Sequence, residues 1–135
     1  MFHARTEMIA DDIFDAEVEG HKVRMDTGSA QKAGQSPMEL LLSAISGCAS
    51  VDVAGIMKKK RRQVNGLVVE TQAERREEPM PRIFTHMKLH FILSSPDAKD
   101  GELAQAVSLA MDKYCSVGGM LREAAKIEYS WEIRS

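Results

Sequence analysis

The 135-residue chain has little of several features that define specialised protein classes. It has only two cysteines, and its formal net charge at pH 7 is −2. A charge this small gives no reason to expect nucleic acid or an anionic membrane surface as a partner. The glycine-rich motifs of nucleotide-binding proteins and the G-x-S-x-G motif of serine hydrolases are missing from the sequence, so those two functions lose their usual markers.

Long hydrophobic runs are scarce as well. The first twenty residues are rich in aspartate and glutamate and have no apolar core, which is unlike a signal peptide. No stretch reaches the roughly 18 uninterrupted apolar residues that a membrane span needs. We therefore expect no membrane partner and a cytoplasmic protein. In that compartment a cysteine pair is more often free, transiently oxidised or metal-binding than a structural disulfide.

What the chain does contain is clear periodicity. Alternation with period two predicts six strands, at residues 2–8, 14–18, 22–26, 67–75, 83–93 and 127–133. Helical spacing predicts three helices, over residues 37–60, 103–114 and 116–125. The order β-β-β-α-β-β-α-α-β predicts one α+β domain over residues 1–135, in which hairpin connections favour antiparallel sheet.

The most informative element is the predicted helix over residues 37–60. Ser36 suits its N-cap, Pro37 its first position and Glu39 the N3 position of a capping box. Apart from Asp52, the body of the helix is uncharged. A helix that is apolar on nearly every side must be covered on nearly every side, and one small chain has too little surface to do so. We expect a second copy to cover it in a twofold homodimer.

Cys48 and Cys115 are the candidate redox residues. Cys48 lies about three turns into the long helix, beyond the reach of the N-terminal helix dipole, so a reactive thiolate there needs a cation from elsewhere in the fold. Cys115 precedes a predicted helix start, where unpaired N–H groups favour a thiolate. Either residue could instead be an inert buried cysteine.

The cation that would activate Cys48 is not fixed by any pattern in the sequence. Arg24, on a predicted strand, is one of several candidate arginines, and an arginine in such a position is more often a solvated surface residue. The Glu39 carboxylate could hold such an arginine in place, although the capping box by itself explains this glutamate.

No metal site is expected from the sequence. Two cysteines need histidine to complete a zinc site. His86 and His90 fall on a predicted strand, where four residues span roughly 13 Å, so they cannot hold one ion unaided. We interpret them as residues of the wetter face of that strand.

Two segments of the chain resemble the osmotically inducible protein C / organic hydroperoxide resistance (OsmC/Ohr) family. They are Ser36-Pro37-x-Glu39-Leu40 leading to Gly47-Cys48-Ala49, and Lys113-Tyr114-Cys115-Ser116-Val117. Together with residues 74–78 they are most similar to the YhfA-like branch, and the order of elements matches over essentially the whole chain. The resemblance implies an OsmC-like fold, with antiparallel sheets wrapped around a long central helix, in an intertwined homodimer whose active sites lie at the subunit interface.

The resemblance also implies a function, the thiol-dependent reduction of organic hydroperoxides in oxidative stress defence. In this family the helix cysteine attacks the peroxide, becomes a sulfenic acid and condenses with the C-terminal cysteine. A dithiol reductant of the lipoyl type then reduces the disulfide, and no cofactor is required. By motif position Cys48 is the peroxidatic residue and Cys115 the resolving one.

One position departs from the family pattern. Met38 stands where the peroxidases of the family place a glutamate, and the carboxylate comes one residue later, at Glu39. One residue on a helix is a rotation of about 100°. This departure favours an alternative function, a non-catalytic module that binds a lipid-like or apolar ligand at the dimer interface.

Overall fold

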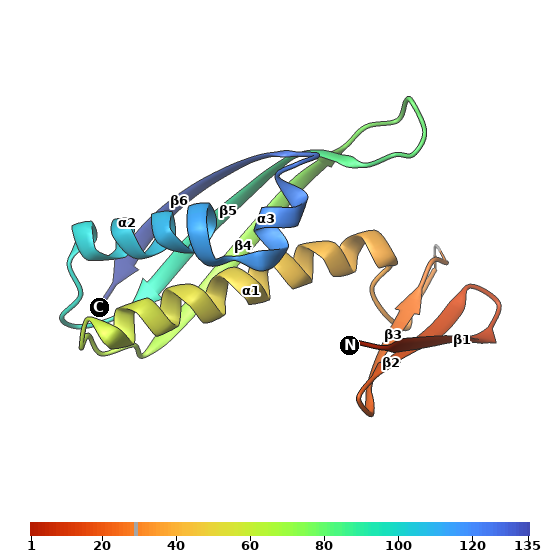
Figure 1. Ribbon diagram of the computed structural model, residues 1–135, viewed down its shortest axis with the longest axis horizontal. Helices are drawn as coiled ribbons and strands as arrows, with labels where there is room; N and C mark the ends of the chain where they lie inside the picture. The colour runs from red at the N-terminus through yellow and green to blue at the C-terminus, as the bar shows by residue number, and fades with distance from the viewer. Residues whose placement is uncertain (29) are drawn as a thin grey trace. The chain divides into compact units, whose positions relative to one another are not determined.

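A computed structural model of the chain describes residues 1–28 and 30–135 (Figure 1). Its elements follow in chain order as β1 (Ala4–Ala10), β2 (Ile13–Val18), β3 (His21–Asp26), α1 (Pro37–Lys59), β4 (Gly66–Arg75), β5 (Phe84–Ser94), α2 (Asp100–Leu109), the π-helix η1 (Ala110–Tyr114), α3 (Ser116–Leu121) and β6 (Lys126–Arg134). The predicted α+β class and order of elements are confirmed. The chain forms two compact units, Met1–Leu41 and Leu42–Ser135, and each is described by itself below.

The first unit contains a three-stranded antiparallel sheet in the order β1-β2-β3. A two-residue turn joins β2 to β3, and both of its residues, Glu19 and Gly20, have positive φ angles of 50° and 82°. This is the conformation that matches the twist of a tight hairpin. The side chains of β1 are exposed at every position. Apolar ones such as Met8, at 65% exposure, therefore have little cover within the chain.

One buried carboxylate organises the loop that follows β3. The two oxygens of Asp26 accept hydrogen bonds from the backbone N–H groups of Ala33 (2.8 Å) and Gly28 (2.7 Å). These two hydrogen bonds hold the pKa of Asp26 below its usual value. Further along, Gly34 passes so close to β3 that a Cβ atom on it would lie 2.3 Å from the backbone oxygen of Arg24. Only glycine fits this position without a shift of the backbone.

Helix α1 begins as its sequence predicts. The Ser36 hydroxyl accepts a hydrogen bond from the Glu39 N–H at 3.1 Å, and the Glu39 carboxylate accepts one from the Ser36 N–H at 2.8 Å. These reciprocal bonds form the expected capping box. The helix ends at Lys59 with two lysines in its last turn, where positive charge is favourable.

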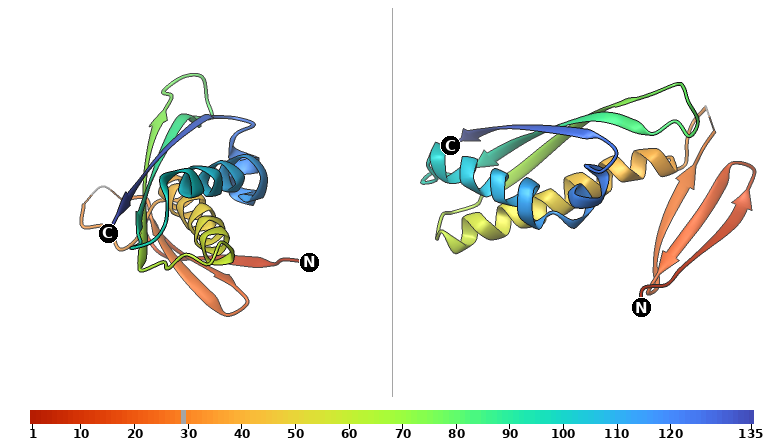
Figure 2. Two further views of the ribbon diagram at one scale, coloured as in Figure 1. Left: turned by 90° about the vertical axis from the view of Figure 1, so that its left-hand side faces the viewer. Right: turned by 45° about the horizontal axis from the view of Figure 1, so that its top comes forward.

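The second unit is a three-stranded sheet in the order β4-β5-β6, with helices packed on one of its faces (Figures 1 and 2). Strands β4 and β5 are antiparallel, as the sequence analysis expected for hairpin-connected strands. Strands β5 and β6 are parallel, so the expectation of antiparallel sheets was wrong for this pair. The parallel pairing arises because the chain between them passes through α2, η1 and α3, and such a crossover returns the chain in the original direction.

The hydrophobic core lies between this sheet and its helices. Strand β5 buries alternate side chains, and α1 buries side chains at four-residue spacing. These residues are Met87, Leu89, Phe91 and Leu93 on the strand, and Ile45, Ala49, Val53 and Met57 on the helix. The alternation predicted for residues 83–93 is therefore confirmed over the buried half of the strand.

Helix α1 is also long and apolar enough, by length and composition alone, to cross a membrane. It has 23 residues and a mean hydropathy of 1.8 over its most apolar window. The core helix of a globular protein meets the same criterion, and α1 packs a stripe of four side chains into the core just described. We therefore treat α1 as a core helix.

Candidate functional site

The second unit brings Cys48 and Cys115 together. Their sulfur atoms and one carboxylate oxygen of Asp52 all lie within 4.8 Å of one another. Both cysteines are free thiols. A disulfide needs its sulfurs to close to about 2.05 Å, so this pair is near enough to bond after a small local movement.

Helix α1 positions two of the three groups. Cys48 and Asp52 are four residues apart, so both side chains lie on one face of the helix. The adjacent residues Ala49 and Val53 are fully buried in the core, which fixes the rotation of the helix about its axis. A hydrogen bond of 2.6 Å between the hydroxyls of Ser46 and Thr71 ties the same part of α1 to β4.

The junction between η1 and α3 positions Cys115. The Cys115 N–H donates to the Ala110 carbonyl at 2.7 Å, and the Cys115 sulfur accepts a hydrogen bond from the Gly118 N–H at 3.2 Å. A Cβ atom on Gly118 would lie 3.2 Å from that sulfur, so a larger residue would crowd the thiol. Glycine at this position therefore leaves room for the Cys115 side chain.

The prediction that the helix start favours a thiolate at Cys115 was wrong. The residue does precede a helix, but it is only 3% exposed. Burial raises the pKa of the Cys115 thiol to about 11, and its neighbours Cys48 and Asp52 add to the rise. The hydrogen bond from Gly118 works in the opposite direction and is outweighed. The effect of desolvation on the pKa of Cys115 therefore outweighs that of the N–H groups at the helix start. Cys115 is protonated at neutral pH.

A mainly apolar cavity adjoins this cluster. Its volume is about 380 Å³, and its lining residues are Val51, Asp52, Gly55, Ile56, Lys59, Leu109 and Tyr114. Asp52 belongs both to this lining and to the group of three donor atoms. The cavity therefore offers space for an apolar group next to Asp52, with one carboxylate and one ammonium group at its wall.

Arg24 and Glu39 lie in the first unit and have separate partners there. The Arg24 guanidinium donates two hydrogen bonds to the Asp15 carboxylate, at 2.8 and 2.9 Å. Glu39 forms an ion pair with Lys32, and this bond together with the bonds to Ser36 lowers the pKa of Glu39 to about 2. The carboxylate that was expected to hold an arginine therefore holds a lysine.

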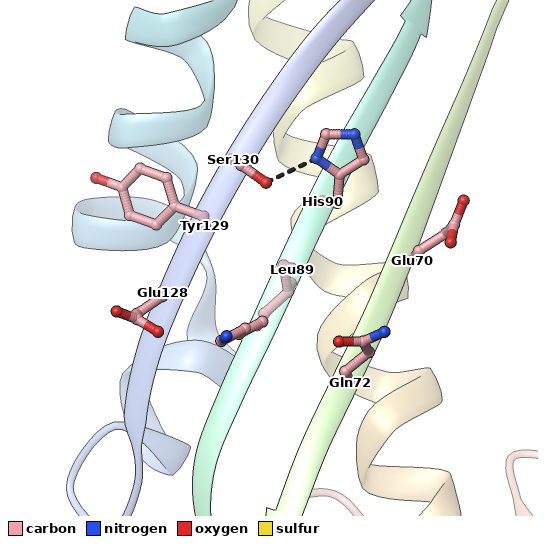
Figure 3. Close-up of a pocket in the computed structure, with 8 residues that line it drawn as sticks. Glu70, Gln72, Leu89, His90, Glu128, Tyr129 and Ser130 are labelled. Atoms are coloured by element: carbon pink, nitrogen blue, oxygen red, sulfur yellow. Dashed lines mark hydrogen bonds between the residues drawn. The ribbon is translucent and has the colours of Figure 1, made fainter.

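The outer face of the second sheet is polar and carries a shallow hollow of about 430 Å³ (Figure 3). His90 lies there and shares a 2.7 Å hydrogen bond with the Ser130 hydroxyl. His86, four residues earlier on the same face of β5, pairs with Glu128 instead. Both histidines thus lie on β5 with different partners on β6, which confirms their predicted place on the wetter strand face.

Asp52 is the site residue whose role the sequence analysis missed. One buried oxygen of its carboxylate has no hydrogen-bond partner among the residues that the structure describes. The signal was present in the sequence, since Asp52 is the one charge within the apolar body of α1 and follows Cys48 by one helical turn. Its closeness to Cys115 could not be read from the sequence, because it depends on how α1 packs against the η1–α3 junction.

The comparisons with known proteins agree with the resemblance drawn from the sequence. A family model described as OsmC-like protein matches residues 27–130. Protein YhfA of Escherichia coli strain K12 is 47% identical over 114 residues, which cover 84% of this chain and 84% of that protein.

Two solved structures show the same fold at lower identity. An OsmC-like protein from Mycoplasma pneumoniae has a TM-score of 0.87 and 16% identity, with 100% of this chain and 98% of that chain covered. An organic hydroperoxide resistance protein OsmC from Legionella pneumophila has a TM-score of 0.71 and 11% identity, with 98% and 96% covered. At these identities the likeness concerns the fold alone.

Proposed function

Because the chain belongs to the OsmC-like protein family, we propose that it is a thiol-dependent peroxidase that reduces organic hydroperoxides in oxidative stress defence. One observation carries the proposal: the sulfurs of Cys48 and Cys115 approach within 4.8 Å of each other and of Asp52, a residue that lines a mainly apolar cavity. The cytoplasm, whose reducing conditions keep such thiols free, is the proposed location.

In the proposed reaction the Cys48 thiolate attacks one peroxide oxygen. A sulfur–oxygen bond forms, the oxygen–oxygen bond breaks, and the leaving alkoxide takes a proton to become an alcohol. The Cys115 thiol then attacks the sulfenic sulfur of Cys48. The disulfide forms, and the departing hydroxide takes the Cys115 proton and leaves as water. A dithiol of the lipoyl type supplies the two electrons that restore both thiols.

The cavity sets the class of peroxide. Its aliphatic lining and the ring of Tyr114 suit an alkyl or aryl group better than the small polar hydrogen peroxide molecule. The raised pKa of Cys115 suits the first step, because a protonated thiol does not compete with Cys48 for the peroxide. The two cysteines thus divide the reaction between them.

We propose Arg24 as the activating cation and Glu39 as the carboxylate that positions the loop before α1. Arg24→Gln should move the pH midpoint of Cys48 alkylation upward and lower the peroxide rate at least about tenfold, because a nearby cation favours the thiolate. Arg5→Gln is the matched control, since Arg5 is an exposed arginine paired with Glu7 in the same sheet. Equal effects of the two substitutions would remove Arg24 from the mechanism.

A homodimer is part of the proposal. Only 22% of the most apolar window of α1 is buried within the chain, and Val51, at the cavity wall, is 73% exposed. A second copy that covered Val51 would both bury this surface and close the cavity from water. The active site would then be complete only in the dimer.

The proposed activity is tested by mixing the reduced protein with cumene hydroperoxide and following peroxide loss with dihydrolipoamide as reductant. Cys48→Ser should abolish turnover. Cys115→Ser should allow one round of attack and then accumulate sulfinic acid at Cys48, because no thiol is left to form the disulfide. Ser50→Ala, one half-turn along the same helix, should retain the wild-type rate.

Mass spectrometry provides the decisive outcome for this function. One equivalent of peroxide should convert the wild-type protein to a species with a Cys48–Cys115 disulfide. A wild-type protein that consumes no organic peroxide, or that consumes it equally well without Cys48, would overturn the proposal.

The cavity of about 380 Å³ also favours a second candidate function, the binding of a lipid-like or apolar ligand without catalysis. A fluorescent fatty acid should then bind with one site per chain, and Val51→Arg should weaken that binding. Cys48→Ser distinguishes the two functions, because it should leave ligand binding intact while abolishing any peroxidase activity.

A further inference from the structure

The cluster of Cys48, Asp52 and Cys115 has the composition of a metal site. Its three donor atoms, two sulfurs and one carboxylate oxygen, all lie within 4.8 Å of one another. In a tetrahedral zinc site, ligands bound at about 2.0–2.3 Å lie roughly 3.5 Å apart, so small side-chain movements bring these three onto one ion. The sequence analysis looked to histidine for a third ligand, and the structure supplies an aspartate.

The carboxylate of Asp52 gives an independent indication of a cation. One of its oxygens is buried and has no hydrogen-bond partner among the described residues. Such an orphaned acceptor is costly in a folded protein and calls for a specific explanation. A cation bound by the Asp52 carboxylate would compensate its buried charge and would also offset its repulsion of the neighbouring thiolates.

The surroundings suit a metal with three protein ligands. The Cys115 sulfur accepts a hydrogen bond from the Gly118 N–H at 3.2 Å, and hydrogen bonds of this kind orient and stabilise metal-bound thiolates. Asp52 also lines the adjoining cavity, so a fourth coordination position could be occupied by water from that side. Thiolate and carboxylate together favour zinc over magnesium or calcium, which take oxygen ligands only.

We propose that Cys48, Asp52 and Cys115 bind one Zn²⁺ ion per chain when both thiols are reduced. Binding releases the two thiol protons to solvent and involves no electron transfer. Metal binding and disulfide formation then exclude each other, since each uses both sulfurs. Zinc would protect the thiols from peroxide, and oxidation of the pair would release the ion.

The test uses the reduced full-length protein, titrated without oxygen with Co²⁺ as a spectroscopic substitute for zinc. We expect a sulfur-to-cobalt charge-transfer band and the visible bands of a tetrahedral site, both saturating at one ion per chain and both lost when zinc is added. Asp52→Asn should weaken cobalt affinity at least about tenfold, the lower end of the loss caused by removing even an outer-shell partner. Asp11→Asn, in the exposed turn of the first sheet, is the matched control and should have no effect.

X-ray absorption of the wild-type zinc complex keeps the proposal testable even when a variant misfolds. The expected first shell has two sulfurs at about 2.3 Å and two lighter atoms at about 2.0–2.2 Å. A shell without sulfur would indicate adventitious binding at surface carboxylates, and a four-sulfur shell would indicate a bridge between molecules. Either result, or a cobalt spectrum equally strong in Asp52→Asn, would overturn the proposal.

Failure of this inference and failure of the proposed function are distinguishable. A protein that reduces cumene hydroperoxide but shows no sulfur-to-cobalt band retains the peroxidase and loses the zinc site. A protein that binds cobalt through two sulfurs but never forms the Cys48–Cys115 disulfide retains the zinc site and loses the peroxidase. If both are present, one equivalent of zinc should slow disulfide formation, and a chelator should restore it.

Discussion

The two sheets of this protein are built from similar alternating sequences, yet they bury those sequences differently. In the second unit, the inner face of β5 is covered by helices, and its four core residues are at most 1% exposed. In the first unit, β1 is exposed along its whole length, and large apolar residues such as Met8 and Ile9 remain accessible. The first sheet therefore has a pattern that calls for a covering surface, and the second already has one.

This difference indicates where the energy of folding resides. The buried hydrophobic residues of the described chain all come from Ile45 onward, so the second unit contains the core that stabilises a single chain. The first unit gains stability from its hairpins and from the hydrogen-bonded loop at Asp26, and its apolar side chains would be buried only in the proposed dimer. The predictions below test this division of roles.

The largest expected effect comes from a matched pair of methionines, one in each sheet. Met87→Ala should lower the free energy of unfolding by about 2–5 kcal/mol, because it opens a cavity in a fully buried site. Met8→Ala should change it by no more than about 0.5 kcal/mol, because the side chain is exposed. Urea titration at protein concentrations below the dimer dissociation constant measures both. Equal losses would show that the first sheet has a core of its own.

The second-largest effect should be on dimerisation. Val51→Asp places a charge on the exposed part of α1 and should weaken dimerisation at least about 30-fold, the change expected for the loss of a strong interface residue. Val68→Asp is the matched control, because Val68 is an exposed valine on β4. Sedimentation over a concentration series measures both variants. A wild-type protein that stays monomeric at high concentration would contradict the expected role of the first sheet and of α1.

The smallest effect should come from Asp26, and it should depend on pH. The lowered pKa of Asp26 means that the folded state holds its proton less tightly than the unfolded state does. Its contribution to stability is therefore present above about pH 3.9, the ordinary pKa, and is lost as pH falls through the lower folded value. Hydrogen exchange at the Ala33 amide should accelerate over that range in the wild type.

In Asp26→Asn the Ala33 amide should exchange faster at every pH and should lose this pH dependence. Asp11→Asn should behave as the wild type does. The same loss in both variants would show that charge in general, and not the buried hydrogen bonds of Asp26, holds the loop.

The sequence was most informative where a local rule decides the structure. Ser36 and Glu39 form the predicted capping box because its geometry involves only four residues, and β5 buries the side chains that its alternation selects. The π-helix η1 was not predicted, because its apolar spacing is close to that of an α-helix. The parallel pairing of β5 with β6 was missed because pairing direction depends on the crossover between them.

The same distinction between local rules and tertiary packing applies to the candidate site. Cys48 and Cys115 could be nominated from motifs, but the raised pKa of Cys115 depends on burial that only tertiary packing creates. Asp52 was visible as an isolated charge, yet its closeness to both sulfurs results from two segments that are distant in sequence. Local chemistry nominates residues, and packing decides which of them meet.

Gly34 shows how such packing constrains the sequence far from any reacting atom. A methyl group at this position would collide with the backbone oxygen of Arg24, so every substitution would have to displace the strand that carries the proposed cation. In a selection for growth in the presence of organic peroxides, variants at Gly34 should be depleted together with variants at Cys48. A mutational map of fitness would then mark this glycine as essential, although it would owe that status to the space it leaves empty.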